Sequence, residues 1–200
     1  MSAVRSRLSA SERRAALLET ASRVFSEGSY RGTTTAEIAR ECGISEPILY
    51  RHFASKRDLY FACMDETWAR MRAKWEEAVA KEQHSAECMG RMTRALHESR
   101  ERVVLASLWV QALAESSEDP EIRRHLRRHL RDVHDFVADV LRRGQETGRI
   151  AADRDAEAEA WIFISIGLLG AVGGRLGGLP GLDLDRIRAS RRRWLTGHDE

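Results

Sequence analysis

The stretch TTAEIARECGISEPILYRHFASKRDLY, residues 34–60, contains two short helical patterns separated by the sequence CGIS at residues 42–45. Thr34 is a candidate N-cap for the first helix, and Glu37 follows three residues later, as in a capping box. Gly43 stands where the chain must turn, because glycine tolerates the positive φ that helix C-termini often need. Small domains use a helix, a glycine turn and a second helix to place a helix in the DNA major groove.

The second helix of this stretch is expected to begin after Ser45, with Pro47 in its first turn, where a missing N–H costs nothing. Leu49 and Phe53 are four residues apart and would face the core. The polar side chains between them are about 100° apart around the helix, so they point in different directions. These side chains are Tyr50, Arg51 and His52.

A third helix expected over Glu12–Glu27 would complete a small core, and Gly28 would end it. Its apolar face consists of Leu17, Ala21, Val24 and Phe25. A helix–glycine–helix segment alone fits a plain helical hairpin as well as a DNA-binding unit. The additional helix favours the DNA-binding interpretation.

The run from Arg14 to about Met64 resembles the DNA-binding domain of the tetracycline-repressor (TetR) family of bacterial transcriptional regulators. The matching motifs are A-x2-V-F (21–25), G-x5-T-x3-I-A (28–39), the CGIS turn, L-Y-x-H-F (49–53) and S-K-x2-L (55–59). The resemblance implies an all-α fold of about nine helices. It implies a helix-turn-helix domain with an N-terminal arm over residues 1–57, and a helical effector-binding and dimerisation domain over residues 58–200.

The resemblance also implies which residues meet DNA. Tyr50 and Lys56 are expected on phosphates, the commonest protein–DNA contacts, and Arg51 is a candidate for a bidentate contact with guanine or for a phosphate. Glu46 cannot donate, so it would either accept from a cytosine amino group or repel the DNA backbone. The full expected set is Thr34, Thr35, Ser45, Glu46, Pro47, Tyr50, Arg51, His52 and Lys56.

Composition and charge favour a helical protein with a basic N-terminal end. The net charge is +2, but residues 1–57 hold ten Lys and Arg against six Asp and Glu. Arg5, Arg7, Arg13 and Arg14 would form either an arm that reaches DNA or a solvated tail. The three cysteines lack metal-ligand spacing and are expected as free thiols in a reducing cytoplasm. No signal segment is evident, the apolar run Trp161–Leu169 is shorter than a membrane span, and neither a cofactor nor a membrane partner is expected.

The remainder of the chain reads as helices with Trp and Met at apolar positions. Such side chains form plain core or line an adaptable pocket; the resemblance favours a pocket for a small apolar or aromatic effector. The candidate pocket residues are Trp68, Met71, Trp75, Met92, Leu96, Trp109, Leu113, Phe136 and Phe163.

His125, His129 and Asp132 have helical spacing that fits a metal site. Five arginines lie in the same segment and would repel a dication, so no metal is expected. The arginines themselves fit a solvated helix face better than a second nucleic-acid patch.

A glycine-rich apolar helix is expected from Asp153 to about residue 173, followed by a last helix near residues 184–194. The interior glycines of the first of these two helices indicate either an early end of that helix or the close approach of another helix. The resemblance implies that the last two long helices form a four-helix bundle with a second subunit; the alternative is packing within one chain. The expected interface residues are Trp161, Ile162, Ile166, Leu169, Gly170, Val172, Gly173, Ile187 and Trp194.

The leading hypothesis is a homodimeric repressor that binds a palindromic operator and is released by a small-molecule effector. The sequence has no Gly-rich phosphate loop, HExxH or GxSxG, so an enzyme is not expected. A non-specific or architectural DNA-binding protein remains the alternative.

Overall fold

The structure is a computed structural model that describes residues 9–81 and 100–197, and these residues form eight helices and no strand. The expected all-α fold is confirmed. The chain divides into two compact units, Met1–Arg70 and Met71–Glu200. The division falls within a helix, whereas the sequence had suggested a boundary at residues 57 and 58.

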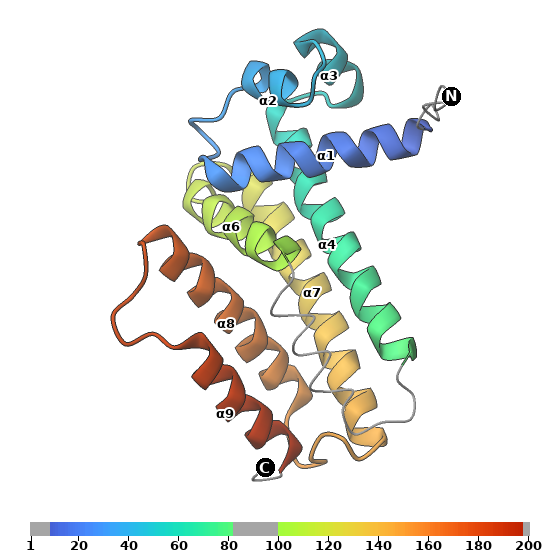
Figure 1. Ribbon diagram of the computed structural model, residues 1–200, viewed down its shortest axis with the longest axis vertical. Coiled ribbons are helices and arrows are strands. Elements are labelled where there is room, and N and C mark those ends of the chain that lie inside the picture. Colours follow the sequence, from blue (N-terminus) through green and yellow to red (C-terminus); the bar gives the residue numbers. More distant parts are fainter. Residues whose placement is uncertain (1–8, 82–99, 198–200) are drawn as a thin grey trace, which may run out of the picture. The chain divides into compact units, whose positions relative to one another are not determined.

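The N-terminal unit contains α1 (Ala10–Glu27), α2 (Thr35–Glu41), α3 (Glu46–His52) and the first part of α4 (Lys56–Lys81) (Figure 1). The first helix begins two residues earlier than expected, because Ser9 caps it. The Ser9 hydroxyl accepts from the N–H of Glu12, and the Glu12 carboxylate accepts from the N–H of Ser9.

Aromatic side chains from three segments pack together in this unit, and those of Phe25 and Tyr60 are fully buried. Phe25 of α1 meets Tyr60 of α4 edge-to-face, with ring centroids 4.9 Å apart, and Tyr30 contacts both rings. Further along α4, the Thr67 hydroxyl lies 3.3 Å from that of Ser22. The unit therefore extends past residue 57, because the start of α4 completes its core.

The C-terminal unit contains the end of α4 and α6 (Arg100–Glu115), α7 (Pro120–Glu146), α8 (Ala156–Arg175) and α9 (Leu184–Thr196) (Figure 1). The last three begin at aspartate N-caps, which accept from N–H groups of the first turn: Asp119, Asp155 and Asp183. The glycine-rich helix thus starts after Asp155 and not at Asp153. Residues 82–99, between α4 and α6, lie outside the described residues.

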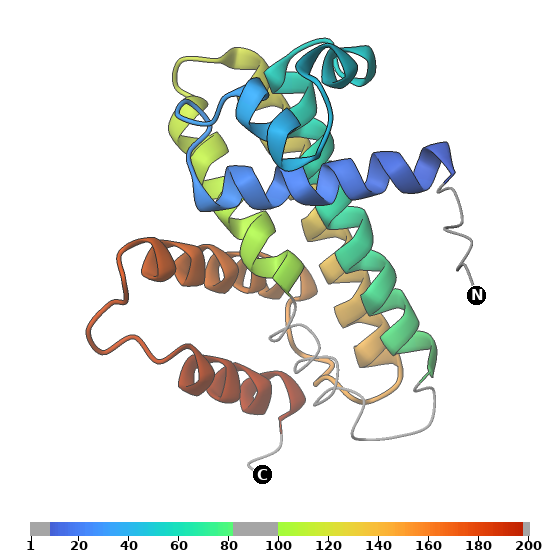
Figure 2. The ribbon, with the colours of Figure 1, turned by 45° about the horizontal axis from the view of Figure 1, so that its top comes forward.

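The last two helices, α8 and α9, run antiparallel and side by side (Figures 1 and 2). A Cβ added at Gly170 would lie 3.2 Å from Leu184, and one at Gly173 would lie 3.1 Å from Leu182. These two glycines allow the end of the chain to approach α8 closely. The two glycines thus have a packing role within the chain, and their place in a subunit interface stays a prediction.

By length and composition α8 is apolar enough to cross a membrane, a test that core helices of soluble proteins also pass. The expectation that this segment is too short to span rested on Trp161–Leu169 alone, whereas the helix has 20 residues. Most of α8's side chains are not buried within the chain. A soluble chain that carries such a helix must cover it with another surface.

Candidate functional site

The turn between α2 and α3 has the geometry that the sequence predicts. Gly43 has φ +67°, the left-handed conformation that glycine adopts without strain. Ser45 is the N-cap of α3, and its side chain makes no capping hydrogen bond. Leu49 and Phe53 are buried against the core. The opposite face of α3 is therefore fixed toward solvent.

The solvent face of α3 presents both polar and apolar groups. Arg51 and His52 are exposed, and Ile48 and Tyr50 expose 40% and 48% of their surface. Exposed large apolar side chains on a short helix are costly unless they meet a partner. This face therefore has the character of a contact surface, and it contains most of the residues expected at DNA.

Thr35 connects α2 to two of these residues in α3. Its hydroxyl donates to Glu46 Oε1 at 2.5 Å, and its oxygen lies 3.1 Å from the hydroxyl of Tyr50. Because Thr35 has a single hydroxyl proton, which it gives to the carboxylate, Tyr50 is the donor to Thr35. Glu46 is thus held in place, and Tyr50 can accept from a partner but cannot donate without leaving Thr35.

The other expected contact residues have defined local roles. Thr34 caps α2 by accepting from the N–H of Glu37 at 3.1 Å. Lys56, at the start of α4, donates to the carbonyl of Arg31 at 3.3 Å and lies 4.8 Å from the ring centroid of Tyr30. Its ammonium group is therefore anchored near the start of a helix, where phosphate is favoured. Of the arginines expected in the arm, Arg5 and Arg7 lie outside the described residues.

A cavity of about 160 Å³ lies within the C-terminal unit and is open to solvent. Helices α4, α6, α7, α8 and α9 all contribute to its walls. Four of the expected pocket residues line it: Met71, Trp75, Trp109 and Phe163.

The remaining expected pocket residues do not line this cavity. Phe136 stacks on Trp75 with ring centroids 5.7 Å apart, so it supports the wall. Leu113 is 62% exposed near the end of α6, since the buried face of that helix passes through Leu105 and Trp109 instead. Trp68 is buried but belongs to the N-terminal unit. Met92 and Leu96 lie outside the described residues.

Four arginines at the cavity were missed from sequence: Arg102, Arg188, Arg191 and Arg192. Burial lowers the pKa of Arg102, and the positive charge of Arg188 lowers it further. Burial also lowers the pKa of Arg191, which pairs with Glu159 of α8. The only sequence signal was the basic run at residues 191–193, and it does not identify which of these side chains face inward.

An exposed apolar stripe runs along α8. It comprises Ile162, Leu169, Val172 and Leu176, with Ser165 between the first two. The spacing of three and four residues alternately is that of helix seams packed knobs-into-holes. Trp161 and Trp194 are also exposed, whereas Ile166 lines the cavity and Ile187 is half-buried.

Comparison with known families assigns both parts of the chain. Residues 17–63 match the model of bacterial regulatory proteins of the tetR family, and residues 90–196 match that of the BetI-type transcriptional repressor C-terminal domain. The chain belongs to the TetR family of bacterial transcriptional regulators. The first match spans α2, the glycine turn and α3, so the helix-turn-helix is the DNA-binding element of this regulator.

Relatives of this TetR-family regulator include both a repressor and an activator. The transcriptional repressor AcnR of Corynebacterium diphtheriae is 32% identical over 143 residues, which cover 72% of this chain and 70% of AcnR. The transcriptional activator FasR of Mycolicibacterium smegmatis is 47% identical over 58 residues, 29% of this chain and 26% of FasR. The relatives are regulators and not enzymes.

A solved structure shares the whole fold of this TetR-family chain. The transcriptional regulator from Saccharomonospora viridis, crystallised with choline, superposes with a TM-score of 0.67 at 24% identity. The superposition covers 96% of this chain and 98% of that one. At this identity the similarity concerns the fold.

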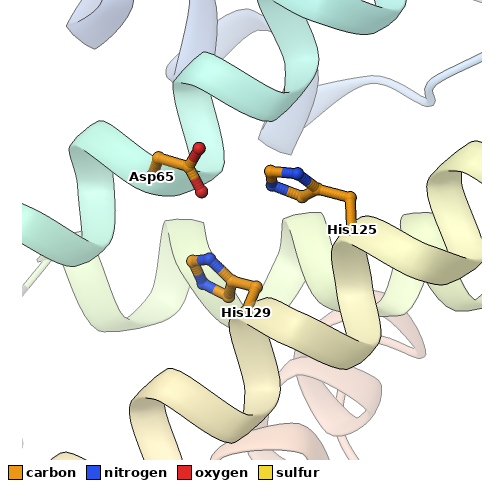
Figure 3. A group of neighbouring side chains, drawn as sticks. All are labelled: Asp65, His125 and His129. Carbon is orange, nitrogen blue, oxygen red and sulfur yellow. The ribbon is translucent and has the colours of Figure 1, made fainter.

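Two histidines of this regulator, His125 and His129, lie on successive turns of α7 and are both buried (Figure 3). Their rings stack with centroids 6.1 Å apart, and Trp109 packs edge-on against His129. The guanidinium of Arg128 donates to His125 Nδ1 at 2.9 Å. Asp132, the third group of the sequence pattern, is exposed, whereas the two histidines are buried.

Proposed function

We propose that this TetR-family regulator is a homodimeric repressor that binds a palindromic operator through α3 and releases it when a small effector enters the C-terminal cavity. The observation that carries the proposal is the open apolar cavity, whose walls include Met71 and Trp75 of α4. The same helix begins in the core of the DNA-binding unit, with Leu59 and Tyr60 buried. A ligand against the end of α4 would therefore act on the helix that supports α2 and α3.

Base reading is assigned to the solvent face of α3. Pro47, Ile48 and Arg51 are exposed there, and an arginine in the major groove reads guanine through a bidentate contact. Glu46 is pre-oriented by Thr35, which favours acceptance from a cytosine amino group over a mobile, repelling charge. Tyr50 and Lys56 would hold phosphates, and Tyr50 must give up its hydrogen bond to Thr35 before its hydroxyl can donate to a phosphate oxygen.

The homodimer is proposed from the apolar stripe of α8. Leu169 and Val172 are 37% and 38% exposed, and Leu176 is 64% exposed. A second copy presenting the same stripe would cover these side chains through a two-fold interface, as helix seams of this spacing do. Trp161 of α8 and Trp194 of the neighbouring α9 would extend the contact. Two-fold symmetry in the protein then requires a palindromic operator.

We place this regulator in the cytoplasm. Two features favour repression over activation. The model matched by residues 90–196 is that of a repressor, and the repressor AcnR is similar over most of this chain. The similarity to the activator FasR covers 29% of the chain. Release follows if the effector binds more tightly to the dimer conformation whose α3 spacing does not fit the groove repeat, since a ligand shifts an equilibrium only by differential affinity.

The test is selection of bound DNA from a random duplex library by the purified full-length protein. We expect an inverted repeat whose half-sites are separated by about one helical turn. Arg51→Ala should alter the base recovered at one symmetric pair of positions. A motif without two-fold symmetry would refute the dimeric reading, and equal binding to the selected and scrambled duplexes would favour the non-specific alternative.

A further inference from the structure

The charged side chains that line the cavity of the C-terminal unit are all cationic among the described residues. Arg102 comes from α6, and Arg188, Arg191 and Arg192 come from α9; no Asp or Glu lines the cavity with them. An effector that is only apolar would gain nothing from these groups, because burying a guanidinium beside an apolar surface is unfavourable. Their presence therefore indicates the charge of the molecule that the cavity receives.

Two of these guanidinium groups, those of Arg102 and Arg188, are close enough to affect each other. Burial lowers the pKa of Arg102, the charge of Arg188 lowers it further, and Asp185 acts in the opposite direction. Asp185 also lies 2.9 Å from Arg188 Nη1. Asp185 thus acts on both cations, and an anion bound between them would further reduce their repulsion.

The neutral polar groups of the cavity also favour an acceptor. The indole nitrogen of Trp109 is buried and has no hydrogen-bond partner in the described part of the chain. Trp109 itself is 5% exposed and lines the cavity. An indole N–H is a donor only, as is a guanidinium. A ligand that complements these donors carries hydrogen-bond acceptors and has no donor of its own that would require an acceptor in the wall. A carboxylate has these properties.

The size and shape of the apolar part indicate a small body. An apolar cavity of about 150 Å³ holds benzene, and this one measures about 160 Å³. Trp75 and Phe163 form an edge-to-face pair at its wall, with centroids 5.5 Å apart. The enclosed space therefore suits one aromatic ring or a short alkyl chain, with the polar end toward α9.

We propose that the effector is a small organic carboxylate with an apolar body of about one aromatic ring, whose carboxylate is received by Arg102 and Arg188. The inference rests on the proposed function, in that the cavity is taken as the effector site. It goes further by fixing the charge of the ligand. A quaternary ammonium is disfavoured, because no acidic side chain in the described wall balances it.

The test compares a carboxylate, an amide and an amine on one phenylpropyl body, with choline added as a quaternary ammonium without the ring. Binding of 3-phenylpropionate, 3-phenylpropanamide, 3-phenylpropylamine and choline to the full-length protein is measured by isothermal titration calorimetry. Operator affinity is measured separately by gel shift. A carboxylate held by guanidinium groups gains charge-assisted hydrogen bonds, so we expect it to bind roughly 10- to 100-fold more tightly than the amide. The two cations are expected to bind more weakly than the amide.

Arginine variants locate the carboxylate. Arg102→Gln and Arg188→Gln should each reduce 3-phenylpropionate affinity about tenfold or more while leaving the amide unchanged, since only the charged contact is lost. The matched control is Arg186→Gln, an exposed position of α9 outside the cavity wall. Unchanged amide binding also shows that the variant is folded.

The outcomes separate this inference from the proposed function. Equal binding of carboxylate and amide, tighter binding of either cation, or no binding of the carboxylate at 1 mM (about 4 kcal/mol) would overturn the inference. Arginine-dependent carboxylate binding that leaves operator affinity unchanged would uphold the carboxylate site and refute effector release. Arginine-dependent binding together with weakened operator affinity supports both.

Discussion

Substitution of Gly167 by alanine tests whether the cavity wall is open where α8 passes it. Gly167 lies in the interior of α8 and lines the cavity, and nothing lies within 4 Å of a Cβ added there. Alanine is favoured over glycine inside a helix by about 1 kcal/mol, and no contact opposes the gain. Gly167→Ala should therefore stabilise the C-terminal unit by about 1 kcal/mol, which corresponds to roughly 3 °C in Tm.

The matched control is Gly144→Ala in α7, where the same methyl group meets a buried side chain. The added Cβ would lie 2.7 Å from Cδ1 and 2.9 Å from Cγ1 of Ile150, which is 3% exposed. Overpacking of this kind costs about 1–3 kcal/mol, so the helical gain is offset or exceeded. We expect Gly144→Ala to lower the Tm or leave it unchanged.

The assay is thermal unfolding followed by circular dichroism at one protein concentration, because a dimer's Tm depends on concentration. The same methyl at Gly167 enters the cavity, so it should weaken binding of a ring-sized ligand while it stabilises the free protein. A lower Tm for Gly167→Ala would show that another surface already fills that space. Equal gains in Tm for both variants would refute the packing argument altogether.

Three further outcomes are expected. Arg51→Ala should weaken binding to the selected operator by about 1–3 kcal/mol and relax the preference at one base pair, measured by fluorescence anisotropy; an equal loss on all sequences would place Arg51 on phosphate. Leu169→Glu should give a monomer in sedimentation velocity, because it puts a charge in the apolar seam of α8, whereas Val103→Glu, at a 59% exposed position of α6, should remain dimeric. In a Cys88→Ser background, alkylation at pH 8 should modify Cys42 and spare Cys63, because burial raises the pKa of Cys63 to about 12. The modified residues are identified by mass spectrometry, and the protection of Cys63 should be lost in denaturant. Modification of Cys63 in the native protein would contradict its burial.

Local signals were sufficient to predict the helix-turn-helix from sequence. Thr34 accepts from the first turn of α2, Gly43 takes the left-handed conformation, and Leu49 is buried, each for a reason that acts within a few residues. The link from Thr35 to Glu46 was not predictable in the same way. It joins side chains eleven positions apart, and their meeting depends on the crossing angle of two helices.

The cavity shows where sequence patterns stop being informative. Apolar periodicity identifies the side of α6 that faces inward, but Leu108, which is buried without lining the cavity, and Trp109, which lines it, both lie on that side. The difference depends on how well five helices fill the space between them. Leu113 was expected in the pocket because its spacing continues that of Trp109, but its side chain is 62% exposed in the described part of the chain.

The arginines of α9 were hidden because a basic run normally indicates a solvated face. This helix has no fully buried residue, although Leu184 lies close to Gly170 of α8 and Leu195 lines the cavity. Its contacts with the rest of the unit include polar ones: Trp194 Nε1 donates to Glu159 at 3.1 Å, Arg191 pairs with the same carboxylate, and Arg154 lies 3.9 Å from the Trp194 ring centroid. Polar contacts of this kind contribute only about 1 kcal/mol each. A ligand that binds the α9 arginines therefore competes with modest interactions, and α9 is the wall of the cavity whose position an anion can change most readily.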